Sequence, residues 1–190
     1  MKKYAAGITE KRLKNRRFRK TEDAILRVFF EEDIYVGIKE MAAKAGVARS
    51  TFYHHHKTAR EIIPDYRRYI LRRYSRMMSG VIRINGIKTR AIYTKTLIFI
   101  MQNQREFEVL LRSGNMDVMK EMIMGVEGWL VKQMRIPNGA RKVFAVYASE
   151  VTELINEWCR RGFRKDEMNR VLDNIMYLTD TARIRLGPIA

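Results

Sequence analysis

The stretch that decides the fold is IKEMAAKAGVARSTFY, which runs from Ile38 to Tyr53. Its apolar residues recur at helical rather than strand spacing on both sides of Gly46. Two short helices joined by a tight turn have the dimensions of a helix-turn-helix motif. Gly46 can adopt the positive φ that such a turn requires, and the small side chain of Ala42 lets the two helices approach closely. The segment therefore predicts a helix-turn-helix.

The two sides of the second helix are predicted to differ in chemistry. Met41, Val47 and Phe52 are apolar, so we expect them to fill the core between the helices. The opposite side carries side chains suited to hydrogen bonds with phosphates and base edges. These outward residues are Arg49, Ser50, Thr51, Tyr53 and His54.

Helical periodicity extends over almost the whole chain, which predicts an all-α fold. A first helix is expected from a cap at Thr21, and a longer one from the capping-box sequence Thr58–Glu61 to about Met78. Glycines from Gly80 to Gly86 indicate a break. Beyond it we expect helices near 89–104, 106–113, 116–135, 140–161 and 166–184. The predicted organisation is a basic arm (1–20), a three-helix DNA-binding domain with the helix-turn-helix (21–79) and a C-terminal helical domain (80–190).

Positive charge is concentrated near the N-terminus of the sequence. The 190 residues include 38 Lys and Arg against 21 Asp and Glu, a net charge of +17. Residues 1–20 contain nine basic residues, Arg17 and Arg19 among them, and one acidic residue. A basic arm beside a helix-turn-helix favours a nucleic-acid partner. We therefore expect truncation of the arm to lower DNA affinity and its salt dependence while leaving sequence preference intact; a solvated tail is the alternative.

Several other classes of protein find no support in the sequence. The single cysteine, Cys159, allows no intrachain disulfide and has no partner that would define a nucleophile, so we expect a buried thiol. The run His54–His56 does not indicate a metal site, because successive helical residues point about 100° apart. No catalytic motif, cofactor loop, export signal or bilayer-length apolar run is visible. The sequence predicts a cytoplasmic protein that is not an enzyme and needs no cofactor.

The region from Thr21 to Ile62 resembles the DNA-binding domain of TetR-family transcriptional regulators. The matching segments are Phe29-Phe30, Ile38–Ala42, Ala45–Val47 and Thr51–His55. The sequence departs from the family pattern at Gly37, Ala48, Ser50, His56 and Ala59. The resemblance implies an all-helical regulator, most simply a repressor, that binds a pseudo-palindromic operator in double-stranded DNA as a homodimer.

The same resemblance implies roles for particular side chains in DNA binding. Thr51, Tyr53 and Lys57 would contact backbone phosphates, and Arg49 and Ser50 would lie near base edges. His55 would share this broad role.

In the C-terminal half, the resemblance implies a dimer interface and an effector pocket. Two apolar stripes would pack against a second subunit, with the core of a single subunit as the less favoured alternative; their residues are Tyr147, Val151, Leu154, Ile155, Trp158, Leu172 and Ile175. The middle helices would hold a possible small-molecule effector, although core packing explains the same residues: Phe99, Met101, Phe107, Met119, Met122 and Trp129. Asn103 and Gln104 are candidate polar contacts.

Two other functions remain open at this point. A non-catalytic architectural protein could use the arm and the net charge to bind DNA without an effector. A peripheral membrane protein could use the same basic N-terminus to bind anionic lipid. The coincidence of the positive charge with a helix-turn-helix favours DNA over a membrane.

Overall fold

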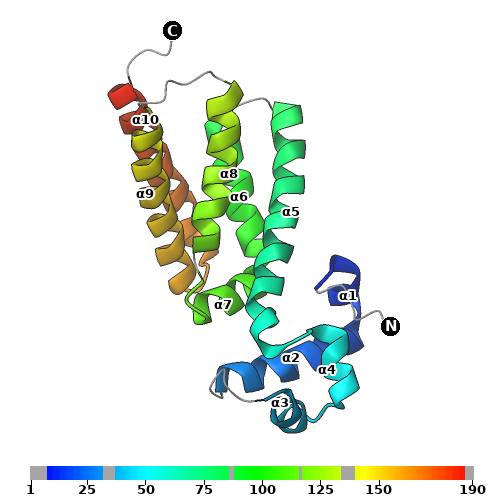
Figure 1. Cartoon of the computed structure of the whole chain (residues 1–190). Helices are drawn as coiled ribbons and strands as arrows, with labels where there is room; N and C mark the ends of the chain where they lie inside the picture. The colour runs from blue at the N-terminus through cyan, green and yellow to red at the C-terminus, as the bar shows by residue number, and fades with distance from the viewer. Residues whose placement is uncertain (1–7, 32–36, 86–87, 116, 134–139, 187–190) are drawn as a thin grey trace. The chain divides into compact units, whose positions relative to one another are not determined.

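The structure is a computed structural model that describes residues 8–31, 37–85, 88–115, 117–133 and 140–186. Helices make up the described chain, which contains no strand, and Figure 1 shows their order. The prediction of an all-α fold is confirmed. The helices are α1 (Glu10–Lys14), α2 (Arg16–Glu31), α3 (Ile38–Lys44), α4 (Arg49–His55), α5 (Ile62–Asn85), α6 (Thr89–Gln102), α7 (Gln104–Arg112), α8 (Asp117–Gln133), α9 (Ala140–Arg160) and α10 (Met168–Leu186), with 3-10 turns η1 (Ala59–Glu61) and η2 (Lys165–Glu167).

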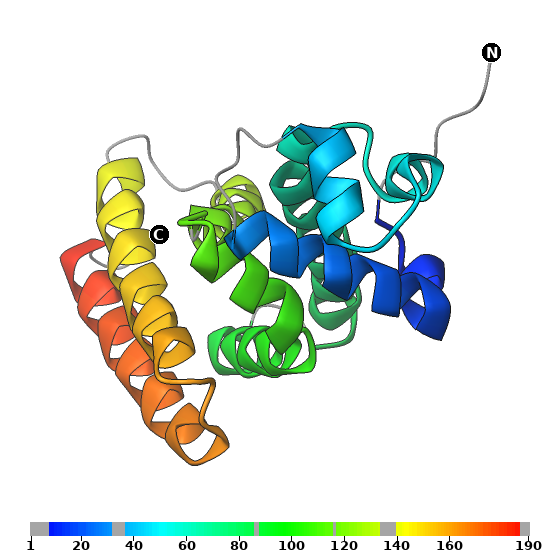
Figure 2. The same cartoon turned by 90° about the horizontal axis from the view of Figure 1, so that it is seen from below.

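The chain divides into two compact units, Met1–Tyr69 and Ile70–Ala190. The division falls within α5, which runs without interruption through Gly80 and ends at Asn85, so the helix continues past Met78 to the far end of the break predicted between Gly80 and Gly86. In the N-terminal unit, α2 packs against α1 and α3, and α3 packs against α4. In the C-terminal unit, α9 packs against α7, α8 and α10, and Figure 2 shows α9 and α10 side by side.

The first long helix starts earlier than the sequence pattern indicates. Asn15 precedes α2 and its side-chain oxygen accepts hydrogen bonds from the backbone N–H groups of Arg17 and Phe18, at 2.9 and 3.1 Å. This is the usual role of a helix N-cap. The predicted cap at Thr21 is therefore wrong, and the basic residues from 16 to 20, which the sequence assigns to the N-terminal arm, belong to the start of α2.

The predicted capping box before α5 is also wrong. Thr58 precedes the 3-10 turn η1, and its side chain makes no capping hydrogen bond. Helix α5 begins only at Ile62 and contains Pro64 in its first turn. Proline is tolerated there because its missing N–H would have no partner within the helix.

Candidate functional site

The helix-turn-helix is built around a turn that depends on Gly46. This residue has φ +65°, and the N–H of Val47 donates to the carbonyl of Ala42 at 2.9 Å to close the end of α3. Met41, Ala42 and Phe52 are fully buried between the helices, as the sequence predicts, and Val47 is half-buried. The turn and this core determine which side of α4 remains outside.

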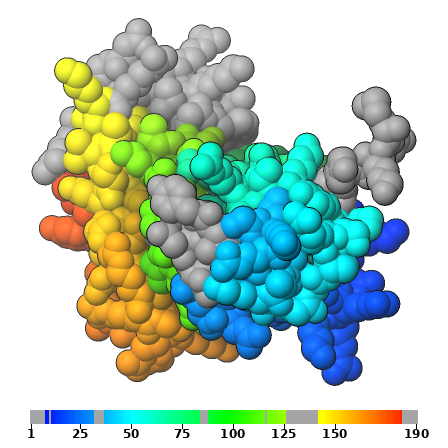
Figure 3. Space-filling model, turned by 60° about the horizontal axis from the view of Figure 1, so that its bottom comes forward, coloured from blue at the N-terminus to red at the C-terminus, as the bar shows by residue number. Residues whose placement is uncertain are grey.

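The outer side of α4 carries most of the predicted DNA-contacting residues. Residues four apart lie on one side of a helix, so Arg49 lies above Tyr53, and Ser50 lies above His54. Arg49, Ser50 and His54 are exposed, whereas Tyr53 is half-buried. Figure 3 shows α3 and α4, in light blue and cyan, as one continuous part of the surface.

Two further predicted contacts flank this row at different depths. Thr51 is half-buried within α4, and Lys57 is exposed directly after the helix ends. The structure therefore brings together a short polar strip at the start of α4 and a lysine beyond its end.

His55 does not belong to this surface, contrary to its predicted role in contacting DNA. Only 3% of the residue is exposed, and its ring stacks on Phe18 with 3.8 Å between the ring centroids. Its Nδ1 lies 2.5 Å from Oε2 of Glu22. The ring is consequently part of the core that joins α4 to α2, and it offers no surface to a duplex.

The contact between His55 and Glu22 is one side of a buried polar cluster that joins α2, α4 and α5. The other Glu22 oxygen, Oε1, lies 2.8 Å from Nε2 of His56 and accepts a hydrogen bond from the Tyr66 hydroxyl at 3.2 Å. The second ring nitrogen of His56, Nδ1, lies 3.1 Å from Oδ2 of Asp65. Since a carboxylate only accepts hydrogen bonds, both nitrogens of His56 must donate, and the ring is an imidazolium.

The pKa values agree with that geometry. Burial by itself would lower the pKa of His56, but hydrogen bonds to Asp65 and Glu22, together with their negative charges, raise it to about 9. Burial would likewise raise the pKa of Glu22, but hydrogen bonds from His55 and His56 outweigh it and lower this pKa to about 2. The cluster therefore holds opposite charges together inside the N-terminal unit.

The basic residues before and within the first turn of α2 have two different roles. Nη1 of Arg12 donates to the main-chain carbonyl of His54 at 3.0 Å, which satisfies an acceptor in the last turn of α4. Arg17 and Arg19 are exposed on α2. Part of the positive charge thus fixes α1 against α4, and part remains at the surface.

The residues predicted to form a dimer interface lie mostly inside one subunit, so that prediction is wrong for all of them except Leu154. The Tyr147 hydroxyl is hydrogen-bonded to the hydroxyls of Tyr93 and Thr179, at 2.9 and 2.8 Å. The indole N–H of Trp158 donates to the carbonyl of Arg164 at 2.8 Å. The buried members are Tyr147, Val151, Ile155, Trp158, Leu172 and Ile175. Leu154 is half-buried and lines a surface groove between α9 and α10, with Glu150, Glu153, Glu157, Asn174, Tyr177 and Leu178.

The C-terminal unit also contains a cavity of about 500 Å³ between α5 and α8. Of the predicted effector contacts, Met122 lines it, and Phe99 packs against the lining residue Tyr74 with 5.5 Å between ring centroids. Phe107 and Met119 are buried core residues, whereas Met101 is half-buried; none of the three lines the cavity. The side chain of Trp129 lies outside the described residues.

The two predicted polar contacts to an effector lie elsewhere. Asn103 is buried and accepts a hydrogen bond from Arg73, while its amide nitrogen donates to the carbonyl of Phe99 at 2.6 Å. Gln104 is exposed and bonds to Glu108 at 2.9 Å. Neither side chain lines the cavity.

The structure also describes the residues that could support other chemistry. Cys159 is buried, which raises its pKa to about 12, as expected for an unreactive thiol. Within the described ranges, no group of three or more His, Cys, Asp or Glu side chains is arranged to hold a metal ion. None of the helices that the structure describes combines the length and apolarity that crossing a bilayer requires.

Comparison with known proteins supports the fold. The structure is similar to that of a TetR-family transcriptional regulator from Streptomyces coelicolor, with a TM-score of 0.50 and 15% sequence identity over 97% of this chain and 88% of that one. At this identity the likeness shows a shared fold. Neither a protein-family model nor a curated protein matches the chain.

Proposed function

We propose that the chain is a DNA-binding transcriptional regulator that reads duplex DNA with α4 and acts as a ligand-responsive repressor. The observation that carries this proposal is the exposed pair Arg49 and Ser50 in the first turn of the second helix of a helix-turn-helix. Residues at the start of such a recognition helix contact base edges in the major groove. In this proposal the protein is not an enzyme, and it acts in the cytoplasm, where DNA is accessible.

The binding experiment compares Arg49→Ala with Lys57→Ala in gel-shift assays on an operator selected from random duplex DNA. Loss of a base contact by Arg49→Ala should cost about 1–3 kcal/mol on the preferred sequence and relax specificity there. Loss of a phosphate contact by Lys57→Ala should weaken every sequence similarly and reduce the salt slope by about one. Lys165→Ala, an exposed lysine of η2, is the control.

Two results would contradict the proposal. Selection that yields no preferred sequence at moderate salt would exclude a specific regulator. Equal losses for Arg49→Ala and Lys57→Ala on all DNA would exclude the assigned roles, even if binding itself were strong.

The proposed homodimer uses the outer side of α9 and α10 rather than their buried stripes. Tyr177 is 73% exposed and Val146 is 52% exposed, while Leu154 and Leu178 are half-buried in the groove between the helices. Large apolar side chains exposed on adjacent helices are typical of a surface that another subunit covers. A two-fold dimer would present two α4 helices to a pseudo-palindromic operator.

The test of the dimer is the change Tyr177→Asp, which adds charge to a groove that already contains three glutamates. We expect the protein to sediment as a monomer and to bind a palindromic operator at least tenfold more weakly, since half of the paired contact is lost. Lys165→Asp introduces the same side chain away from the groove and should leave the dimer intact. Dimers of unchanged stability in the Tyr177→Asp protein would rule out this interface.

The cavity between α5 and α8 favours a ligand-responsive regulator over an architectural DNA-binding protein. A cavity of this volume lies within the range of small-molecule sites, about 300–1,000 Å³. A ligand that binds only one arrangement of the dimer would shift the protein towards that arrangement and change its DNA affinity.

A further inference from the structure

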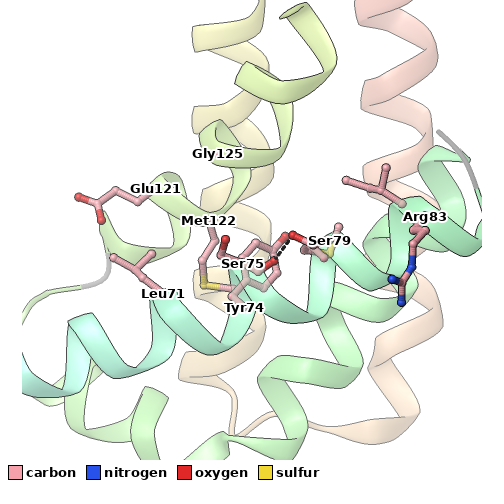
Figure 4. Close-up of a pocket in the computed structure, with 10 residues that line it drawn as sticks. Leu71, Tyr74, Ser75, Ser79, Arg83, Glu121, Met122 and Gly125 are labelled. Atoms are coloured by element: carbon pink, nitrogen blue, oxygen red, sulfur yellow. Dashed lines mark hydrogen bonds between the residues drawn. The ribbon is translucent and has the colours of Figure 1, made fainter. Parts of the chain in front are cut away.

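One side of α5 forms most of the wall of the cavity between α5 and α8, so the lining extends along this helix. The α5 residues recur three and four positions apart along the helix, so they form a single stripe along one side of it. From Leu71 to Arg83 this stripe extends about 18 Å at 1.5 Å per residue. Figure 4 shows the lining, which consists of Leu71, Tyr74, Ser75, Met78, Ser79, Ile82, Arg83, Glu121, Met122 and Gly125.

The middle of the cavity is apolar in effect. Met78 and Met122 are 3% and 2% exposed and contribute flexible thioether side chains, which adapt to irregular ligands. Two of the hydroxyl groups here already have partners. The Tyr74 hydroxyl pairs with Oγ1 of Thr96 at 3.0 Å, and the Ser79 hydroxyl donates to the carbonyl of Ser75 at 2.9 Å (Figure 4).

Gly125 widens the cavity on the α8 side. A Cβ atom added at this glycine would meet nothing within 4 Å, so the missing side chain leaves open space. The body of a ligand in this part of the cavity should consequently be apolar.

The two ends of the cavity carry opposite charges. Arg83 lies at one end of the stripe, and Figure 4 shows Glu121 with Leu71 at the other. Arg83 is exposed at its end of the cavity. A guanidinium at the mouth of an apolar cavity is suited to a carboxylate, which it can bind through two parallel hydrogen bonds. Glu121 has a carboxylate and not a guanidinium, so only the Arg83 end offers these hydrogen bonds, and the ends favour one orientation.

We propose that this cavity binds an elongated apolar carboxylate of the fatty-acid class, with its carboxylate on Arg83 and its tail along α5 towards Leu71. The inference rests on the proposed function, because such a ligand would be the effector of the regulator. Its chemistry follows from the length of the stripe, the paired polar groups in the middle and the cation at one end.

The direct test is isothermal titration of the full chain with laurate below its micellar concentration, without DNA. We expect saturable binding of one laurate per chain. Arg83→Gln should weaken it about tenfold, the loss expected for one charge-assisted contact near solvent. Arg76→Gln removes an exposed arginine of the same helix that does not line the cavity, and this control should bind as the unmodified protein does.

A second pair of variants tests the position of the tail. Gly125→Leu should fill the open space and weaken laurate more than tenfold, whereas Gly125→Ala should bind laurate within about threefold of the unmodified protein. Circular dichroism and melting temperature establish that both variants fold. Laurate binding that is unchanged by Gly125→Leu in a folded protein would overturn the site.

Two matched ligands test the head group. Dodecanol and dodecyltrimethylammonium share the tail of laurate but lack its negative charge, and we expect both to bind at least tenfold more weakly. Tighter binding of the cation would place the head group at Glu121 and overturn the proposed ligand class. Equal weakening of laurate by Arg76→Gln and Arg83→Gln would show a general effect of positive charge and would also overturn it.

Gel shift separates this inference from the proposed function. If laurate binds at Arg83 but the protein shows no sequence preference on DNA, the site stands and the regulator proposal fails. If the protein binds an operator specifically but laurate does not bind, the regulator stands and the ligand class fails. Release of the operator by laurate, lost in Arg83→Gln but retained in Arg76→Gln, would support both.

Discussion

His56 links three helices of the N-terminal unit through its two ring nitrogens. His56 is one of the positions at which the sequence departs from the family pattern that it resembles. In this chain the ring contacts Glu22 and Asp65, and the side chain of His56 is fully buried. A buried ion pair contributes little net stability, but removal of one partner leaves an uncompensated charge. His56 should accordingly be far less tolerant of substitution than its exposed neighbour His54.

The raised pKa of His56 makes the stability of the N-terminal unit depend on pH. The imidazole of the unfolded chain has a pKa of 6.5, and that of the folded chain is about 9. The folded state thus binds the proton more tightly than the unfolded state does. The stabilisation that results is fully present below pH 6.5 and is lost as the pH rises through 9. We expect the free energy of unfolding to fall by roughly 2–3 kcal/mol over this interval, measured by urea denaturation at a series of pH values.

Substitutions of two adjacent histidines provide the control for this pH dependence. His56→Gln should lower stability at pH 6.5 and remove most of the decline towards pH 9. His54→Gln changes an exposed ring and should retain the full decline. A decline of equal size in His56→Gln would show that another group titrates.

Sequence reasoning could not find this cluster, and the reason lies at the level of residues. The predicted cap at Thr21 would place Glu22 in the first turn of a helix, where a carboxylate suits the helix dipole, but α2 begins at Arg16 and Glu22 is fully buried. Its partners lie more than 30 positions away in the sequence. The only signal was the departure from the family pattern at His56, which indicates a change at this position without indicating its partner.

At the scale of elements, the turn between α3 and α4 was predictable in detail because one residue governs it. Gly46 has the positive φ that its place in the motif requires. By contrast, the start of α2 was missed because Asn15 caps the helix within a run of basic residues, where periodicity gives no clear signal. The apolar residues of α9 and α10 do form stripes at helical spacing, as predicted. Periodicity does not show, however, whether the core of the same chain or a partner chain covers such a stripe.

Two glycine substitutions should change stability in opposite directions. Gly46→Ala adds a Cβ that contacts nothing within 4 Å, so its cost comes from the backbone, which alanine adopts poorly at φ +65°. We expect a loss of about 1 kcal/mol. Gly80→Ala lies inside α5, also with open space around the new Cβ, and should gain about 0.5–1 kcal/mol.

Thermal unfolding of the two alanine variants measures this difference. The N-terminal unit should melt at a lower temperature in Gly46→Ala, and the C-terminal unit at a higher one in Gly80→Ala. A gain in stability from Gly46→Ala would contradict the assigned turn.

At the scale of the whole molecule, the role of the net charge of +17 can be tested only by variants that change the charge without disturbing the fold. Removal of residues 1–20 would also remove Ile8 and Leu13, which are 1% and 7% exposed, and the contact of Arg12 with α4. Truncation would thus weaken the helix-turn-helix along with the charge, and a loss of DNA binding would not identify its cause. Neutralisation of surface residues on α2 isolates the electrostatic contribution.

The informative variant changes four exposed residues of α2 to glutamine: Arg16, Arg17, Arg19 and Lys20. If each contacts a phosphate, the slope of log affinity against log salt should become shallower by about 0.9 per residue, and affinity at low salt should fall most. Preference between operator and random DNA should persist, because phosphate contacts carry no direct sequence information.

A control with equal loss of charge completes this experiment. Arg160, Arg161, Lys165 and Arg170 are exposed in the C-terminal unit, and their change to glutamine lowers the net charge by the same amount. If α2 touches the duplex, only the α2 variant should change the salt slope strongly, since a contact releases counterions whereas distant charge acts through a screened field. Equal slopes in the two variants would show that net charge alone accounts for the effect, and α2 would then have no direct role at the phosphate backbone.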